Sequence, residues 1–324
     1  MRNPVVMAGL TGHLLAVLLL LACLPAGAQE VVTFTPQWTP QTQYAGYYVA
    51  FHKGFFAEEG LDVVLDQFSG SSSGTAIEKI SQGKTDIINI HIVTAMIARD
   101  KGLKLINVLQ TSQVNSLMCV SHSPIDSPQS LKGKRVGRWK VGFAEIYDAY
   151  CNRCGIQVEW IPYIQGINLF VSKAVDALLC YSYSEYLQLV LAMGSIPQEN
   201  VIRLKDFGLD YPEDGLYVTE RYYRRHKETV DKFVRASKRG WDYAREHPDE
   251  ALEITMGFIK EYNVATNLTL QRMMLEEVLR LQINPDTGEA DYAPMKREAW
   301  DDLESLLRES GYVRKGVKYE EMIR

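Results

Sequence analysis

The sequence has few cysteines, no block of basic residues and, beyond its leader, no long apolar run. Five cysteines in 324 residues are too few for a disulfide scaffold, and a net charge of −5 argues against nucleic acid as a partner. A phosphate-binding P-loop, a His-Glu-x-x-His pair and a Gly-x-Ser-x-Gly motif are also missing. We therefore expect no catalytic residues, no metal site and no cofactor.

Composition and the pattern of apolar runs predict an α/β fold. A chain of 324 residues that is 46% hydrophobic can bury a core large enough for two lobes. In its first part, runs that are apolar on both faces alternate with helical segments, as buried parallel strands do: 31–35, 61–68, 85–90 and 103–110. Between them we expect helices over 44–59 and 75–82.

A second, smaller α/β unit follows, and a helix-rich segment ends the chain. We expect this unit to begin after the run 116–121. Its further strands are expected near 134–137, 158–164, 175–180 and 201–204. The run 214–220 is then expected to be a strand that leads back to the first unit, and helices should dominate from residue 221 onward.

The first residues have the pattern of an export signal. Arg2 supplies a positive start, residues 14–22 are apolar, and residues 25–28 are the small residues of a cleavage position. We expect residues 1–28 to be a signal peptide cleaved before Gln29; the alternative is lipid attachment at Cys23. The apolar run is too short to cross a bilayer. The mature protein is thus expected to be exported to the periplasm, either free or held by that lipid.

Five phrases resemble the periplasmic substrate-binding proteins of the thiamine-pyrimidine family, which comprises bacterial formylaminopyrimidine-binding proteins and, more distantly, fungal thiamine pyrimidine synthase. In chain order they are QWTPQTQYAGYYVAFHKGFFAEEGLDV, ISQGKTDI, SPQSLKGKRVG, VDALLCYSYSE and VDKFVRASKRGWDYAREHPDEA. They extend over most of the mature chain. The GFFAEEGLDV and SLKGKRVG pieces together are specific for the binding-protein fold, but they do not name a ligand.

The resemblance implies a type II periplasmic-binding-protein architecture, in which two hinge crossings near 116–121 and 214–220 join two α/β lobes. Lobe one would comprise residues 29–117 and 216–324, and lobe two residues 118–215. Such a monomer closes on a small-molecule ligand and delivers it to the membrane subunits of an ABC importer. The ligand implied first is a thiamine pyrimidine precursor; a flavin-like ring or a small sulfonate is the alternative.

An enzyme on the same fold is the other functional class, and the sequence departs from it. The fungal synthase uses a Lys and a His, and an ungapped match places Ile90 and Thr94 at those positions. Its cysteine-rich iron segment matches 206–218, which has no cysteine. We therefore expect a binding protein and not an enzyme.

Aromatic residues near the first strand are candidate ligand contacts. Trp38 follows that strand, and open α/β sheets bind ligands at the carboxyl ends of their strands. In the family, its counterpart stacks on the pyrimidine; the alternative is packing at a lobe edge. Tyr44 and Tyr47 begin the next predicted helix and are candidates too, although such a face more often belongs to the core.

Two further candidates come from lobe one. His91 ends the third predicted strand, where its imidazole could bond a ring nitrogen or be a satisfied core histidine. The loop that includes Ser72, Ser73, Gly74 and Thr75 precedes a helix and offers backbone N–H groups to an anion, although such loops usually only turn.

Lobe two supplies candidates after two of its strands. Trp139 and Gly142 lie in a strand–loop–helix segment, and Tyr181, Tyr183 and Glu185 follow the VDALLC strand. Either tyrosine could flank a flat ring. Glu185 could accept hydrogen bonds from a ligand amine, or it could be an exposed acidic residue at a helix start. Near the second crossing, Glu213 and Asp214 are lesser candidates.

Cys151 and Cys154 form a Cys-x-x-Cys pair, which can be redox-active, provide half a zinc site or do neither. No second pair has this spacing, and Gly155 is typical of a helix end. We expect free thiols or an incidental disulfide.

Overall fold

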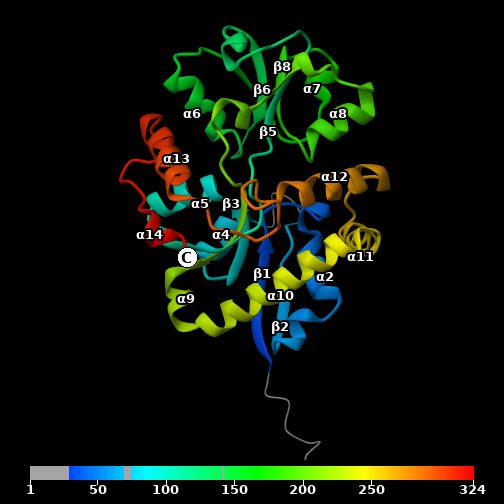
Figure 1. The fold of residues 1–324 in the computed structure, drawn as a ribbon, viewed down its shortest axis with the longest axis vertical. Coiled ribbons are helices and arrows are strands. Elements are labelled where there is room, and N and C mark those ends of the chain that lie inside the picture. The colour runs from blue at the N-terminus through cyan, green and yellow to red at the C-terminus, as the bar shows by residue number, and fades with distance from the viewer. Residues whose placement is uncertain (1–28, 69–73, 141) are drawn as a thin grey trace, which may run out of the picture.

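The computed structural model describes residues 29–68, 74–140 and 142–324. The expected signal peptide, including Cys23, lies outside the described residues, as do Ser72 and Ser73. The chain forms two α/β lobes, one above the other in Figure 1. No helix in the described part is long and apolar enough to cross a membrane.

Lobe one is built on a five-stranded sheet in the order β2-β1-β3-β10-β4. The strands are β1 (Glu30–Pro36), β2 (Leu61–Leu65), β3 (Ile87–His91), β4 (Leu105–Gln110) and β10 (Asp214–Thr219). The predicted β1, β2 and β3 pair in parallel, and every residue of β3 is buried, as its apolar pattern predicts. β10 runs antiparallel to β3 and β4.

Lobe two repeats this plan in the order β7-β6-β8-β5-β9. Its strands are β5 (Leu117–Ser121), β6 (Arg135–Trp139), β7 (Glu159–Tyr163), β8 (Ala177–Tyr181) and β9 (Val201–Arg203). β5 is antiparallel to β8 and β9, as β10 is to its neighbours in lobe one. In both sheets the antiparallel strand is the first strand after the chain arrives from the other lobe.

Helices cover both sheets (Figure 1). Those on the lobe-one sheet or beside it are α2 (Ala45–His52), α3 (Phe55–Glu58), α4 (Ala76–Ser81), α5 (Ile92–Asp100), α9 (Glu220–Arg225), α10 (Lys227–Glu246), α11 (Pro248–Glu261), α12 (Leu268–Leu281), α13 (Arg297–Glu309) and α14 (Tyr319–Met322). Lobe two has α6 (Glu145–Arg153), α7 (Asn168–Val171) and α8 (Glu185–Met193).

The helix expected over 44–59 is divided into a 3-10 turn at Thr42–Tyr44, α2 and α3. Gly54 has a φ of 77°, and this left-handed conformation separates α2 from α3. The prediction of one continuous helix was therefore wrong, because Gly54 interrupts it. The helix expected over 75–82 is α4.

Two short segments carry the chain between the lobes. The runs 116–121 and 214–220, expected to be the crossings, form β5 and β10 inside the sheets, and the chain passes between the lobes just before each strand. The crossing segments, 111–116 and 208–213, are tied together. Ser112 Oγ accepts hydrogen bonds from the backbone N–H of Glu213 at 2.7 Å and of Asp214 at 2.8 Å. These two hydrogen bonds hold the crossing segments side by side where the chain passes between the lobes.

Two C-terminal helices of lobe one also reach lobe two. α13 packs against α6, where Arg153 Nε and Glu309 Oε2 are 2.7 Å apart. On the other side of the molecule, α12 packs against α8 (Figure 1), and Ser182 donates a hydrogen bond to Glu277. The lobes therefore touch on both sides of the crossings.

Lobe one also depends on a close approach of α2 to α10. A Cβ atom at Gly240 would lie 2.0 Å from the carbonyl oxygen of Gly46, and one at Gly46 would lie 2.1 Å from Trp241 Cδ2. Neither position has room for a side chain.

Gly240→Ala is therefore expected to lower the free energy of unfolding by about 1–3 kcal/mol, because the helices must separate. The matched control is Gly257→Ala in α11, where an added Cβ meets nothing within 4 Å. That change should raise the free energy of unfolding by about 0.5–1 kcal/mol, because alanine has a higher helix propensity than glycine. Urea unfolding followed by circular dichroism measures both. A Gly240→Ala protein as stable as the parent would contradict the close packing.

Candidate functional site

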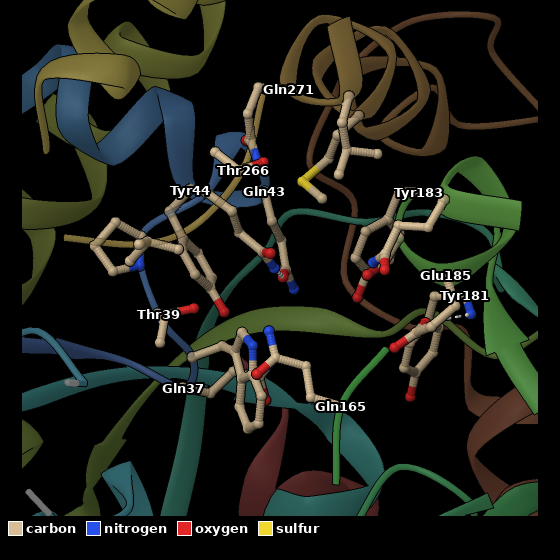
Figure 2. Close-up of a pocket in the computed structure, with 18 of the residues that line it drawn as sticks. Gln37, Thr39, Gln43, Tyr44, Gln165, Tyr181, Tyr183, Glu185, Thr266 and Gln271 are labelled. Atoms are coloured by element: carbon tan, nitrogen blue, oxygen red, sulfur yellow. Dashed lines mark hydrogen bonds between the residues drawn. The ribbon is translucent and has the colours of Figure 1, made fainter. Parts of the chain in front are cut away.

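A cavity of about 140 Å³ lies between the lobes, where the carboxyl ends of β1, β3, β6 and β8 meet. Parallel strands present their carboxyl ends at one sheet edge, so the two sheets bring their strand-end loops together. Figure 2 shows Tyr44 and Gln43 on one side of this space and Tyr183 and Glu185 on the other. Segments far apart in the sequence thus form one site.

Most of the candidate residues line this cavity: Trp38, Tyr44, His91, Trp139, Tyr181, Tyr183 and Glu185. Tyr47 and Gly142 do not. Tyr47 is buried in lobe one, where its ring centroid lies 5.1 Å from that of Phe34 and 5.4 Å from that of Trp241. Gly142 takes a φ of 67° in the turn that presents its neighbour Phe143.

Trp38 stands on a loop that its neighbours hold in place. Its ring stacks on Phe68, with centroids 5.4 Å apart and planes 16° apart. Gln67 donates a hydrogen bond to the Trp38 carbonyl oxygen and accepts one from Tyr48 OH at 2.7 Å. Since Phe68 covers one face of the indole and Trp38 lines the cavity, the other face is the one available to a ligand.

Lobe two contributes a stack of three aromatic rings. The Tyr181 ring lies between Trp139, with centroids 4.8 Å apart, and Tyr183, with centroids 5.3 Å apart. Both faces of Tyr181 are thus covered. A ligand could therefore stack only on an outer ring of the three, Tyr183 or Trp139, and Trp139 also packs against Tyr163 at 5.7 Å.

Glu185 is a buried carboxylate at the start of α8. Its Oε1 accepts a hydrogen bond from Trp139 Nε1 at 3.0 Å, and its Oε2 accepts one from the Tyr181 backbone N–H at 3.3 Å. Burial raises the pKa of Glu185, and these hydrogen bonds act in the opposite direction. A carboxylate has about four acceptor positions, so each oxygen keeps one for a ligand.

Glutamines supply most of the other polar groups of the cavity, and sequence analysis did not identify them. They are Gln37, Gln41, Gln43, Gln165, Gln188 and Gln271. Asp214 orients two of them, because its carboxylate accepts from Gln37 Nε2 at 3.0 Å and from Gln43 Nε2 at 2.8 Å. These glutamines belong to no sequence motif and come from separate segments of the chain. The sequence therefore could not indicate that the fold places them around one cavity.

Two buried polar atoms beside the cavity, Tyr44 OH and His91 Nε2, have no hydrogen-bond partner among the described residues. His91 Nδ1 lies 3.3 Å from Tyr181 OH, across the lobe boundary, while Nε2 lies 3.5 Å from Asp214 without bonding it. Burial lowers the pKa of His91, so the neutral imidazole is favoured. Because buried polar groups are nearly always paired, these atoms mark positions where a ligand could bond.

Phe143 was not a predicted contact, yet it lies at the centre of the lobe interface. Its ring meets Trp38 edge-on at 6.2 Å and His91 at 5.2 Å, both in lobe one. Its φ of 70° is rare for a residue with a side chain. The only sequence signal near this position was the Gly-containing turn.

Electrostatically, the cavity does not suit an anion. Among the described residues, no Lys or Arg lines it. Of the predicted anion-binding loop the structure describes Gly74 and Thr75, and neither of these two residues lines the cavity. The Thr75 N–H instead donates to Glu78 Oε2 at 2.7 Å in a capping box at the start of α4.

None of the four described cysteines lines the cavity. Cys119, Cys151, Cys154 and Cys180 are free thiols. Burial raises the pKa of the Cys151 thiol to about 12, which leaves little reactive thiolate near neutral pH. Within the described residues, no group of three or more His, Cys, Asp or Glu side chains could hold a metal ion.

Glu213 joins the two crossings beside the site. It accepts hydrogen bonds from Ser116 N at 3.2 Å and from Ser116 Oγ at 2.5 Å, and burial raises its pKa to about 8. The folded pKa lies above the ordinary value of 4.5. The stability contributed by the neutral carboxyl is therefore complete below about pH 4.5 and is lost as the pH rises through 8.

Glu213→Gln should therefore flatten the pH dependence of stability between these limits. Each unit of pKa difference corresponds to about 1.4 kcal/mol. As the pH rises, the free energy of unfolding of the variant should therefore increase relative to that of the parent. Urea unfolding at pH 5 and at pH 8 measures this. If the free energies of unfolding of the two proteins change equally between the two pH values, the buried carboxyl does not titrate in this window.

Two known binding proteins are similar to this chain over most of its length. The formylaminopyrimidine-binding protein of Halalkalibacterium halodurans is 28% identical over 308 residues, covering 91% of each chain. The riboflavin-binding protein RibY of Chloroflexus aurantiacus is 27% identical over 294 residues, covering 87% of this chain and 81% of that protein.

Similarity to solved structures confirms the predicted fold. The periplasmic aliphatic sulphonate binding protein SsuA from Escherichia coli matches with a TM-score of 0.67 and 14% identity, covering 91% of this chain and 97% of its own. The two α/β lobes therefore form the periplasmic-binding-protein fold, as expected. Residues 41–251, well over half of the sequence, match the family described as NMT1/THI5 like. The chain belongs to the NMT1/THI5-like family.

Proposed function

We propose that the protein is the solute-binding component of an ABC uptake system that captures a small planar heterocycle, with a thiamine pyrimidine precursor as the first candidate. The observation that carries the proposal is Glu185, a buried carboxylate held by Trp139 inside an aromatic cavity that lies between two lobes. A carboxylate pairs with the amine and ring N–H groups of such heterocycles through charge-assisted hydrogen bonds.

The size of the cavity favours one ring over three. Its volume is about 140 Å³ in this arrangement of the lobes. An apolar protein cavity of about 150 Å³ binds benzene, so a single six-membered ring with small substituents matches this space. A flavin-like tricycle, the ligand class of the RibY relative, would require the lobes to stand further apart.

The charge of the cavity favours a neutral or cationic ligand over a sulfonate. Glu185 lines it, and no Lys or Arg does so among the described residues. A sulfonate would lose its water without gaining a cation, and burying an unpaired charge is costly. The chain shares its fold with SsuA, but a cavity lined by Glu185 and, among the described residues, by no cation does not suit an anion.

The chain's own residues also support binding over catalysis. At the two positions matched to the synthase's Lys and His, Ile90 is buried in β3 and Thr94 lies in α5. Neither can form an imine or supply an imidazole. The proposed role includes export to the periplasm, a monomeric state and docking on the membrane subunits of an importer; lipid attachment at Cys23 is the alternative to a free chain.

Titration calorimetry with three ligand classes tests this function. The panel is an aminopyrimidine (formylaminopyrimidine), riboflavin and an alkanesulfonate. We expect the aminopyrimidine to bind most tightly and to reduce the radius of gyration in solution scattering, because lobe closure traps the ligand. Preferential binding of the sulfonate, or turnover of any of the three, would contradict the proposal.

A further inference from the structure

A second cavity, of about 360 Å³, lies on the side of the molecule where α12 meets lobe two. We call it the rear cavity. It is lined by the first crossing (Asn115, Ser116), the start of β5, and Ser182, Tyr186 and Leu187 around the start of α8. The end of β9 and the 3-10 turn Leu204–Phe207 contribute Arg203 and Lys205, and α12 contributes Glu277 and Arg280. No described residue lines both this cavity and the proposed ligand cavity.

The rear cavity has an excess of positive charge. Arg280 is neutralised by Glu277, whose Oε2 lies 2.7 Å from Arg280 Nε. Arg203 bonds the neutral amide of Gln198 at 3.1 Å. Among the described residues, neither Arg203 nor Lys205 forms an ion pair with a carboxylate, although the protein as a whole carries a net charge of −5. Two positive charges therefore remain uncompensated in one hollow.

The same structural elements line both cavities. Ser182 belongs to the rear cavity, while its neighbours Tyr181 and Tyr183 belong to the ligand cavity. α12 likewise places Met274 in the ligand cavity and Arg280, further along the helix, in the rear cavity. The hydrogen bond from Ser182 to Glu277 crosses between the lobes in the rear wall.

We propose that the rear cavity is a second binding site, for a small oxyanion with two negative charges, such as inorganic phosphate or a dicarboxylate. Arg203 and Lys205 of lobe two neutralise the anion, and Arg280 of lobe one contacts it from α12. The anion is thus bonded from both lobes, by the two cations of lobe two and by the N–H groups of Arg280 that do not bond Glu277. It therefore stabilises the arrangement in which the lobes touch. An anion in the rear cavity therefore raises the affinity of the ligand cavity for the heterocycle of the proposed function. By linkage, the heterocycle raises the affinity of the rear cavity for the anion by the same factor.

Titration calorimetry at constant ionic strength, with sodium chloride as the reference salt, tests the site. The probes are inorganic phosphate and succinate, which separate the phosphate source from the dicarboxylate source. We expect saturable binding of at least one of them with a stoichiometry near one. The double variant R203Q/K205Q should weaken it at least tenfold.

The matched control is K101Q/K132Q, which removes the same net charge at exposed positions that line neither cavity. It should bind within about twofold of the parent. Thermal unfolding shows whether each variant is folded. No saturable binding of either probe, or an equal loss in both double variants, would overturn the site. An unchanged radius of gyration at saturating probe would overturn its effect on the lobes.

Discussion

Glu185→Gln should weaken the binding of an aminopyrimidine roughly tenfold to a hundredfold. A hydrogen bond to a charged group contributes about 1.5–3 kcal/mol, and the substitution makes the acceptor neutral and replaces one oxygen by an N–H donor. Inside the protein, the remaining amide oxygen can still accept from Trp139 Nε1, and only the longer bond of 3.3 Å from the Tyr181 backbone N–H is lost. Folding should therefore be retained.

The matched control is Glu145→Gln. Glu145 begins α6 as Glu185 begins α8, and burial raises the pKa of both carboxyls, but Glu145 does not line the ligand cavity. Its substitution should leave affinity within about twofold of the parent. Calorimetry on the three proteins measures the difference. Equal affinity of Glu185→Gln and the parent would show that no ligand amine bonds this carboxylate.

Trp38→Ala should also lower the affinity for a flat ring by roughly tenfold to a hundredfold. Removing one aromatic wall costs about 1–3 kcal/mol, by analogy with aromatic pairs and stacked bases. Trp38 is only half-buried, on the rim of the cavity, so the folded state should survive. Phe68, which backs the indole, cannot replace it without moving by the thickness of a ring.

Trp38→Phe is the matched control for this prediction, because it keeps a flat face in the same place. It should lose much less affinity than Trp38→Ala. Fluorescence or calorimetric titration of both variants with the tightest ligand of the panel decides the point. Should Trp38→Ala bind as tightly as the parent, the indole does not stack on the ligand.

Local sequence patterns predicted the strands well but not their arrangement. The run TDIINI is apolar on both faces, and it forms the central, fully buried β3. The antiparallel β10 was expected only as a strand leading back, and its place between β3 and β4 depends on long-range pairing. Such pairing has no signature in a short segment.

The candidate site could be predicted where an aromatic or histidine residue lies at the end of a predicted strand. Trp38, His91 and Trp139 each end or follow a strand, and the structure brings them to one cavity. Helical spacing did not separate Tyr44 from Tyr47, because Tyr44 belongs to the 3-10 turn and Tyr47 to α2. Only Tyr44 reaches the cavity; Tyr47 packs in the core.

A crystal structure of the protein with the tightest aminopyrimidine of the panel tests the central claim most directly. The account predicts the ring between the lobes, with one face on the indole of Trp38 and its amine within hydrogen-bonding distance of Glu185. Tyr44 OH or His91 Nε2 should gain the partner that it lacks. A ligand bound outside this cavity, or bound inside it with Glu185 untouched and Trp38 turned away, would contradict the account.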